Sequence, residues 1–311
     1  MKLNRTTTGI LLAVIATIIW SGNFIVARGV INDIPPILLA FCRWLCASLI
    51  MIPLGWKSFR SQWFEVKRHP VHFFWAAIFG VSIFNTLVYI AGHFSQAINL
   101  ALIGTTSSPV FSFILARIFL KERIPPKRMA GLLICIVGIL IILSRGSLEQ
   151  LYRFQFTKGD WWVLTGALSF AIYNVLAKRK PTAIRPVTYL FTTFWIGTLA
   201  ILPFAIAEYW LNPQPIHFTA GLAGIILYLG AGASVASFFC WNAAIARLGA
   251  ANTSLFGNLI PVFSSLEAVW LLHEKILPTH IAGMIFVFAG LFLSNLRDRK
   301  KTLNTEQSAT N

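Results

Sequence analysis

Long runs of apolar residues, separated by short polar connections, make up almost the whole chain. A helix that spans a bilayer needs ~20 mostly apolar residues, and the runs have this length. The longest polar connections, 56–70 and 145–159, are too short to hold a soluble domain. The pattern predicts an all-α membrane protein with ten transmembrane helices, at 8–28, 35–55, 71–92, 95–120, 126–144, 160–178, 186–209, 217–243, 249–272 and 278–296.

The composition supports a membrane protein. Hydrophobic residues make up 57% of the chain and charged residues 12%, about half of the ~25% found in soluble proteins. These values exclude a soluble enzyme, a secreted disulfide scaffold and a disordered chain. Four cysteines lie inside apolar runs without zinc-ligand spacing, so we expect no metal site, disulfide or cofactor: Cys42, Cys46, Cys135 and Cys240.

The positive charges concentrate on one side of the predicted topology. With a cytoplasmic N-terminus, the ten spans divide the Lys and Arg residues of the connections and ends 19 to 5, with two more inside spans. Cytoplasmic loops carry the excess of Lys and Arg, so we expect both termini in the cytoplasm. The bias also explains the net charge of +16 without a nucleic-acid partner. We expect a multi-pass protein of a cell membrane, most readily a bacterial inner membrane.

The N-terminal end of the chain is predicted to be a membrane span and the C-terminal end a disordered tail. Lys2 and Arg5 precede an apolar run, as in a signal peptide, but the run is too long and no A-x-A site ends it. We therefore expect it to remain as the first span. Residues 298–311 are polar and are predicted to form a disordered cytoplasmic tail.

The sequence contains an internal repeat. A shift of 152 residues aligns 80–138 with 232–290 without a gap, with 15 identities in 59 positions. A shift of 150 matches residues of the earlier part. We therefore predict a first five-helix repeat at 1–148 and a second at 149–297. Because five is odd, the second repeat enters the membrane from the opposite side, and inverted repeats are typical of secondary transporters.

Three motifs relate the chain to a known family. They are WSGNFIVAR in the first span, PPILLAFCRW in the second, and PVFSFILARIFLKERIPPKRMAG, which recurs as PVFSSLEAVWLLHEKILPTHIAG. With these motifs the chain resembles the EamA type of the drug/metabolite transporter superfamily. The resemblance covers nearly the whole chain. It implies two five-helix halves that export or exchange small metabolites, often amino acids, purines or amphiphilic drugs. His273 departs from the family pattern, which usually has glycine before the glutamate.

Arg43 is the most prominent candidate for chemistry. It lies near the middle of the second span, where a charge costs ~2.5–3.5 kcal/mol on insertion scales. Its counterpart in the repeat is Thr193, so the charge breaks the internal symmetry. One interpretation is an anchor for an anion, such as a substrate carboxylate. The other is a structural cation that binds backbone carbonyls or a helix end.

Two further ionisable residues are candidates for a proton or ion-pair role. Glu267 lies in the middle of the ninth span, where its repeat counterpart is Leu115. It is interpreted as a proton carrier, as the partner of Arg43, or as a structural hydrogen-bond acceptor. His93 lies near the external end of the third span and is interpreted as a gating residue or an ordinary surface histidine.

Polar and aromatic residues recur at helical spacing in several spans. Such stripes are unfavourable against lipid, so we expect them to face inward. They predict a central cavity with aromatic walls and incompletely packed rings; the alternative is hydrogen bonding between helices. The candidate substrate-binding residues are Trp20, Asn23, Arg43, Asn85, Tyr89, Thr105, Ser108, Tyr173, Asn174, Trp241, Asn242 and Asn258.

Two prolines and two glycine-rich faces complete the set of candidates. Pro109 and Pro261 are predicted to lie mid-span at equivalent positions, as matched hinges or as plain kinks. Spans 126–144 and 278–296 carry small residues on one face. This face predicts close packing within a monomer or a homodimer contact through these two spans.

The sequence predicts transport rather than catalysis. It has no phosphate-binding loop for ATP and no motif of a metalloprotease or serine hydrolase. We expect a secondary transporter that moves small organic metabolites, amino acids or related amphiphilic solutes, outward across the cytoplasmic membrane by alternating access. Its expected partners are a small-molecule substrate and the lipid bilayer. The alternatives are a channel, a receptor or a lipid-modifying membrane enzyme.

Overall fold

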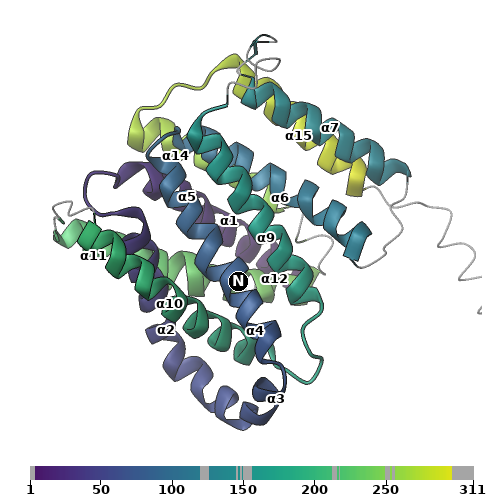
Figure 1. Cartoon of the computed structure of the whole chain (residues 1–311). Helices are drawn as coiled ribbons and strands as arrows, with labels where there is room; N and C mark the ends of the chain where they lie inside the picture. Colours follow the sequence, from purple (N-terminus) through teal and green to yellow (C-terminus); the bar gives the residue numbers. More distant parts are fainter. Residues whose placement is uncertain are drawn as a thin grey trace, which may run out of the picture.

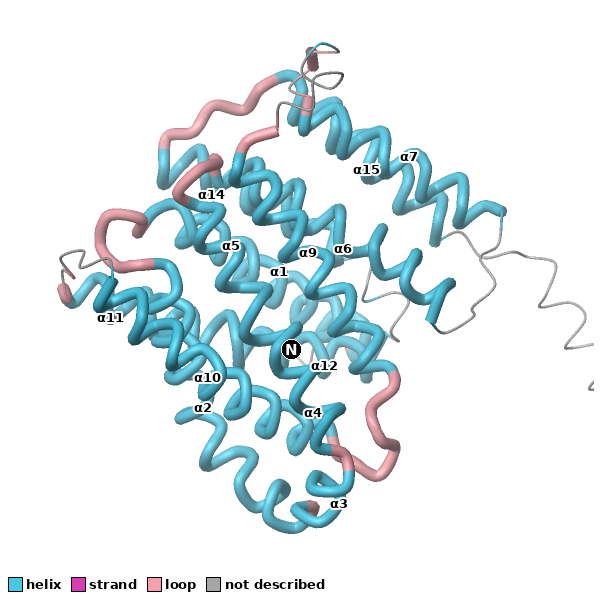
Figure 2. The backbone as a smooth tube through the Cα atoms, viewed as in Figure 1, coloured by secondary structure: helices cyan, strands magenta, loops and turns pink. Residues whose placement is uncertain are grey.

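A computed structural model describes residues 4–119, 126–144, 146–147, 149, 156–211, 216, 218–248, 253 and 256–295. Every regular element in these ranges is helical, and the long helices pack into one bundle (Figure 1). The connections that the structure describes lie at the ends of the helices (Figure 2).

The first half of the chain contains α1 (Arg5–Gly29), α2 (Pro36–Ser61), α3 (Trp63–Arg68), α4 (Pro70–Ala77), η1 (Ile78–Ile83), α5 (Phe84–Gly92), α6 (Ala97–Phe119) and α7 (Pro126–Leu143). The second half contains α9 (Lys158–Lys178), α10 (Pro186–Leu211), α11 (Ala220–Leu227), η2 (Tyr228–Ala236), α12 (Ser237–Leu248), η3 (Gly257–Leu259), α14 (Ile260–Leu272) and α15 (Pro278–Asn295).

The helix starts show why the chain divides at these points. Proline occupies the first turn of α2 and α4, where its missing N–H leaves no broken hydrogen bond. Thr157 and Asp160 form a capping box at the start of α9. Carboxylates from distant elements also bind the starts of α2 and α6. Glu208 of α10 accepts hydrogen bonds from the first amides of α2, and Glu274 accepts them from the first amides of α6.

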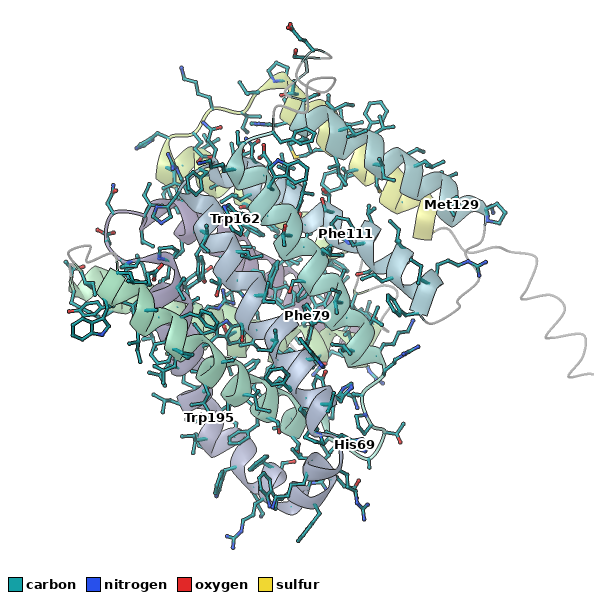
Figure 3. All side chains as sticks on the ribbon, in the orientation of Figure 1. His69, Phe79, Phe111, Met129, Trp162 and Trp195 are labelled. Carbon is teal, nitrogen blue, oxygen red and sulfur yellow. The ribbon has the colours of Figure 1, made fainter. Side chains whose placement is uncertain are left out.

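Six described helices are long and apolar enough to cross a membrane: Arg5–Gly29, Pro36–Ser61, Pro70–Gly92, Ala97–Phe119, Pro186–Leu211 and Ala220–Ile245. Three shorter apolar helices cover Met129–Ile142, Ile260–Leu272 and Pro278–Gly290. Large apolar side chains are exposed on many helices, among them Met129 and Trp162, which Figure 3 labels. The chain thus has the helices and the apolar surface of a multi-pass membrane protein.

The helix contacts follow the internal repeat. α1 packs against α12 and α14, and its repeat counterpart α9 packs against α5 and α6. α2 packs against η2, and its counterpart α10 packs against η1. α2 also packs against α10, and α7 against α15. The contacts of α1 and α2 are therefore repeated by the equivalent helices α9 and α10, and the contacts α2–α10 and α7–α15 each join a helix to its own repeat counterpart.

The third span of each half contains a π-helical segment. These segments, η1 and η2, lie at matching positions of the repeat and include the matched pairs Gly80/Gly232 and Ser82/Ser234. A π-helical segment widens the turn and weakens the regular α-helical hydrogen bonding. The regular α-helix is therefore interrupted at matching positions in the third span of each half. These two interruptions were not predicted from the sequence.

The two prolines differ in their structural context. Pro109 lies inside α6, as predicted. Pro261 lies in the first turn of α14, directly after the 3-10 turn η3, so the regular α-helix is interrupted just before this proline, and its role as a hinge or a kink stays a prediction. Since Pro261 has no N–H to donate to Gly257, that carbonyl accepts instead from Ile260, which closes a 3-10 turn.

α7 and α15 lie side by side along one edge of the bundle (Figure 1). Their small residues face each other: a Cβ added at Gly138 would lie 2.8 Å from the carbonyl oxygen of Gly283, and one at Gly290 would lie 2.5 Å from that of Gly131. The glycine faces therefore pack within one chain. A homodimer through these helices stays a prediction and would need their other faces.

Candidate functional site

The polar residues of the interior gather around α1, which contacts elements of both halves. Asn23 on this helix is 6% exposed, and Ser21 is fully buried. Gly22 lies between them against the ring of Tyr228, where a Cβ would overlap the tyrosine hydroxyl. The absence of a side chain at Gly22 thus allows α1 to approach η2 closely at this level.

Arg43 is the centre of this polar cluster. Its guanidinium comes from α2 and is 5% exposed. The Nε atom donates to the Ser234 hydroxyl of η2 at 2.9 Å. The Nη1 atom donates to the side-chain oxygens of Asn23, of Asn85 at 2.8 Å and of Tyr89 at 2.8 Å. One cation therefore joins α1, α2 and α5 of the first half to η2 of the second half.

The hydrogen bonds of Arg43 are unevenly distributed. Nη1 has two hydrogens but lies within bonding distance of three acceptors, whereas Nη2 has no hydrogen-bond partner among the described side chains. No carboxylate of the described residues forms an ion pair with Arg43. The guanidinium is thus a buried cation that neutral groups hold and no anion compensates.

Glu267 belongs to the same region but binds a different partner. Its Oε1 atom accepts a hydrogen bond from Ser21 at 2.6 Å, and its Oε2 atom is buried without a partner in the described structure. The ion pair with Arg43, one of the three predicted roles, is therefore absent from this structure. Tyr228 donates to the carbonyl of Ile19 and lies close enough to Arg43 and to Glu267 to interact electrostatically with both.

Two of the predicted cavity rings, Trp20 and Trp241, pack against each other. Their ring centroids are 5.1 Å apart, and the Trp20 indole donates to the carbonyl of Ala233 at 3.0 Å. Both rings are half-buried. Because Trp20 comes from α1 and Trp241 from α12, this pair also joins the two halves.

The other predicted rings do not form one wall with this pair. Tyr173 packs against Phe170 and Gly80, between α9 and η1. Tyr89 bonds to Arg43, but it is 1% exposed and fully packed, so the predicted incomplete packing is wrong for this ring. Its hydroxyl needs a buried partner, and the ring that carries the hydroxyl fills the space between α5 and α1.

Several predicted polar residues bind elsewhere. The Thr105 hydroxyl donates to Ala101, and the Asn242 amide donates to Phe238, each within its own helix. Asn242 is also exposed, which places it outside the buried cluster. Asn174 of α9 lies 3.4 Å from the Ser112 hydroxyl of α6.

The remaining two predicted residues add little to the cluster. Ser108 is buried in α6, and its side chain forms no hydrogen bond with Arg43 or with the described partners of Arg43. The side chain of Asn258 lies outside the described residues.

Sequence reasoning missed Ser21 and Tyr228 as members of the site. Ser21 stands beside Trp20 in the motif WSGN, and its hydroxyl oxygen also lies 2.6 Å from the carbonyl oxygen of Ile18, so its single proton is shared between this carbonyl and Glu267. Tyr228 begins η2 and has no repeat counterpart of its own chemistry, since position 76 is alanine. The signal in the sequence that could have identified Tyr228 is Gly22, because a glycine inside a helix leaves space for a large side chain from a neighbouring helix.

His93 lies directly after α5, half-buried and close to Arg28. Burial, and then the neighbouring Arg28 charge, lower the pKa of His93 below its ordinary value. As the pH falls, His93 is therefore protonated near pH ~6.5 in the unfolded chain and only at a lower pH in the folded protein. Folding stability that is present above this pH is lost as the pH falls through the interval between the two pKa values.

We expect this loss to be measurable as a fall in Tm. Between about pH 7 and about pH 5, the Tm of the detergent-purified protein should decrease more than that of the variant His93→Gln, which cannot take up the proton. The two proteins should have similar Tm values above pH ~7, where the histidine is neutral in both states. Equal acid-induced decreases in both proteins would contradict this prediction.

Comparisons with known proteins identify the family. The sequence profile of the EamA-like transporter family matches twice, at residues 7–144 and 157–296. The chain is 26% identical over 297 residues to the uncharacterized transporter YyaM of Bacillus subtilis (strain 168), covering 94% of this chain and 95% of that protein. It is 25% identical over 293 residues to a protein of Salmonella typhimurium named "Probable amino-acid metabolite efflux pump", covering 91% and 93%.

A solved crystal structure has the same fold. It covers 93% of this chain and 96% of its own, with a TM-score of 0.61 and 17% sequence identity. The first profile match contains Arg43 with Asn23, Asn85 and Tyr89, and the second contains Ser234 and Glu267. Together they cover most of the sequence, and the chain therefore belongs to the EamA-like transporter family.

Proposed function

We propose that this transporter exports small organic solutes with an anionic group, amino acids or related amphiphilic molecules, by alternating access between two inverted five-helix halves. The ten spans, the cytoplasmic termini and the bacterial inner membrane are parts of the same proposal. The observation that carries it is the buried, uncompensated guanidinium of Arg43 at the junction of the two halves.

The substrate group follows from the hydrogen bonds that Arg43 leaves unused. A carboxylate accepts two parallel N–H bonds from a guanidinium, and the free Nη2 atom supplies donors for such a pair. A carboxylate would also relieve the crowding at Nη1, where three neutral acceptors share two hydrogens. Glu267, with one oxygen free, is the proposed acceptor for a proton or for a substrate ammonium group.

The packing of the two halves supports alternating access. Since Arg43 is 5% exposed, a solute reaches it only after α1, α5 and η2 move apart. The matched π-helical segments provide a weakened point in the third span of each half. The contacts of α1 and α2 with the second half each have a counterpart in which the equivalent helices of the other half take part. An inverted repeat with such matching contacts can open to either side of the membrane in equivalent ways.

The names of relatives support outward transport of amino acids. One relative carries the name "Probable amino-acid metabolite efflux pump", and another, from Streptantibioticus cattleyicolor, is named "Probable terminal-alkyne amino-acid exporter". We extend these names to this chain because its site offers the two charges of opposite sign that a zwitterion requires.

Counterflow into proteoliposomes tests the function directly, with a panel of radiolabelled amino acids as probes. We expect saturable counterflow of at least one of them. Trp241→Ala should weaken its apparent affinity by about 1–3 kcal/mol, because the half-buried ring is a contact surface beside Trp20. Trp210→Ala is the matched control, since Trp210 is 76% exposed at the far end of α10.

The outcomes of this experiment separate the candidate functions. A large loss of Tm in Trp241→Ala with unchanged affinity would assign the ring to the core of the protein. Unsaturable flux would favour a channel, and formation of a product would favour an enzyme. Equal effects of the two tryptophan variants would contradict a substrate-binding role for Trp241.

Reporter fusions test the proposed topology. A reporter fused after Asn311 should be active in the cytoplasm, and one fused near Gln150 should be active outside it, because five spans separate the two points. Fusions that report the same side would overturn the ten-span arrangement.

A further inference from the structure

A second polar region lies at one end of the bundle, away from the partners of Arg43. It is a pocket of about 640 Å³ where α1 ends, α6 begins and α14 ends. Figure 1 shows the α1–α2 connection close to the end of α14. The polar residues that line it are Arg28, Asn32, Gln96, His273, Glu274 and Lys275. A volume of this size is typical of sites for small molecules.

The charge of this pocket is positive. Arg28 and Lys275 are two of the five Lys and Arg residues on the side predicted to be external. Neither forms an ion pair within the described chain, and Arg28 uses one nitrogen, Nη1, to bind the carbonyl of Gly92 at 3.1 Å. The only carboxylate in the lining, Glu274, is occupied, because its two oxygens accept from the amides of Ala97 and Ile98 at 2.8 and 3.0 Å. The helix dipole of α6 compensates its charge further.

The backbone at His273 is unusual in a way that concerns the pocket. Its φ of 54° and ψ of 30° place it in the left-handed region, and it is the one non-glycine residue with positive φ in the described chain. Helices commonly end in this conformation with glycine, which has no Cβ to hinder it. The chain has an imidazole here instead, and this imidazole lines the pocket beside Lys275. Backbone strain of this kind concentrates at binding sites.

We propose that this pocket binds a small organic carboxylate, with Arg28, His273 and Lys275 as its ligands. The exposed amides of Asn32 and Gln96 supply further hydrogen-bond donors. Arg28 and Gln96 belong to the first half of the chain, and His273 and Lys275 to the second. A bound carboxylate therefore connects the two halves at this end of the bundle and stabilises the arrangement seen here. That this end faces the outside rests on the proposed topology, whereas the site itself does not.

The test measures binding to the purified full-length protein in a neutral detergent at constant ionic strength. Succinate is the probe, and succinamide is its uncharged counterpart. We expect succinate to raise the Tm and to bind saturably by calorimetry, and succinamide to do neither. Lys275→Gln should weaken succinate binding by about tenfold, the effect of one charge-assisted hydrogen bond. His273→Gly should also weaken binding while leaving the Tm without ligand unchanged or higher, because glycine relieves the left-handed backbone.

Lys158→Gln is the matched control. Lys158 is an exposed cation at the same end of the bundle, where Gly159 packs on Ser95, but it does not line the pocket. Binding that is absent in the wild type, or that is reduced equally by Lys158→Gln and Lys275→Gln, would overturn the proposal. So would binding that both pocket variants leave unchanged, since the succinate would then lie elsewhere.

A lipid headgroup is the other source of an anion at such a position. The same titration is therefore repeated in nanodiscs of phosphatidylcholine alone and of phosphatidylcholine with phosphatidylglycerol. We expect similar succinate affinity in both. Its loss in the phosphatidylglycerol discs would overturn the small-carboxylate assignment in favour of a lipid phosphate. These measurements require no transport, so their failure leaves the proposed function intact, and a failure of counterflow leaves this site intact.

Discussion

Arg43→Lys is expected to lose most transport activity while remaining folded. Lysine retains the positive charge but replaces the planar fork with one ammonium group, so the paired hydrogen bonds to a carboxylate are lost. A hydrogen bond to a charged group contributes about 1.5–3 kcal/mol. The expected loss in the transport rate at low substrate concentration is therefore roughly 10–100-fold. The measurement is counterflow in proteoliposomes together with the Tm of the same preparations.

Thr193→Ala provides the matched control in the other half of the chain. Thr193 is the repeat counterpart of Arg43, and its hydroxyl bonds to the backbone of its own helix, to Tyr189 and Leu190. Its loss should change transport by less than about threefold. A folded Arg43→Lys protein with wild-type transport would contradict the carboxylate anchor and favour the structural cation. Loss of both activity and folding in Arg43→Lys would likewise favour the structural role.

The sequence was sufficient to select Arg43, Asn23, Asn85 and Tyr89 as candidates, but it did not predict that these side chains bind one another. A charge in the middle of an apolar span needs polar neighbours, and the helical spacing of Asn85 and Tyr89 placed them on one face of the third span. Asn23 stood within a motif of the first span. These residues could be selected because the choice depends on local periodicity and on the high cost of an unpaired charge in the membrane.

The pairing of Glu267 was not predictable in the same way. A carboxylate and a guanidinium that both lie in the middle of apolar spans suggest an ion pair, but the choice of partner depends on how far each helix is rotated. Ser21 faces Glu267 because Gly22 allows α1 to lie close to η2, and Ser264 donates to the carbonyl of Ser21 at 3.3 Å. Such contacts depend on the tertiary approach of elements more than 200 residues apart in the sequence.

The interruptions of the helices were also predicted only in part. Proline marks a possible break in the sequence, which located Pro109 correctly. It did not reveal that Pro261 follows a 3-10 turn, because proline is as compatible with the start of a helix as with a kink. The π-helical segments carry no proline and begin within ordinary apolar sequence. Their visible signals are the matched pairs Gly80/Gly232 and Ser82/Ser234, which periodicity alone does not interpret.

The approach of α1 to α5 controls the geometry of the Arg43 cluster, and it depends on Gly92. A Cβ at this position would lie 2.5 Å from the carbonyl carbon of Ala27 and closer still to its oxygen. These are backbone atoms of a helix, so they cannot turn aside as a side chain can. Gly92 lies one turn beyond Tyr89, and Ala27 one turn beyond Asn23. Separating the helices here would pull apart the Tyr89–Asn23 hydrogen bond, which measures 2.9 Å.

Gly92→Ala is therefore expected to have the largest effect on stability of any single methyl group added to this protein. Overpacking typically costs about 1–3 kcal/mol, and the backbone contact places this variant at or above the upper limit. We expect a marked decrease in Tm and, below that Tm, weaker transport because the cluster around Arg43 is distorted. Gly224→Ala is the control: Gly224 also lies inside a helix, but a Cβ there meets no atom within 4 Å. That variant should stay within ~1 kcal/mol of the wild type, since alanine favours the helix over glycine. Equal tolerance of the two alanines would show that α1 and α5 lie farther apart than described here, and the connection between their contact and the Arg43 cluster would fail with it.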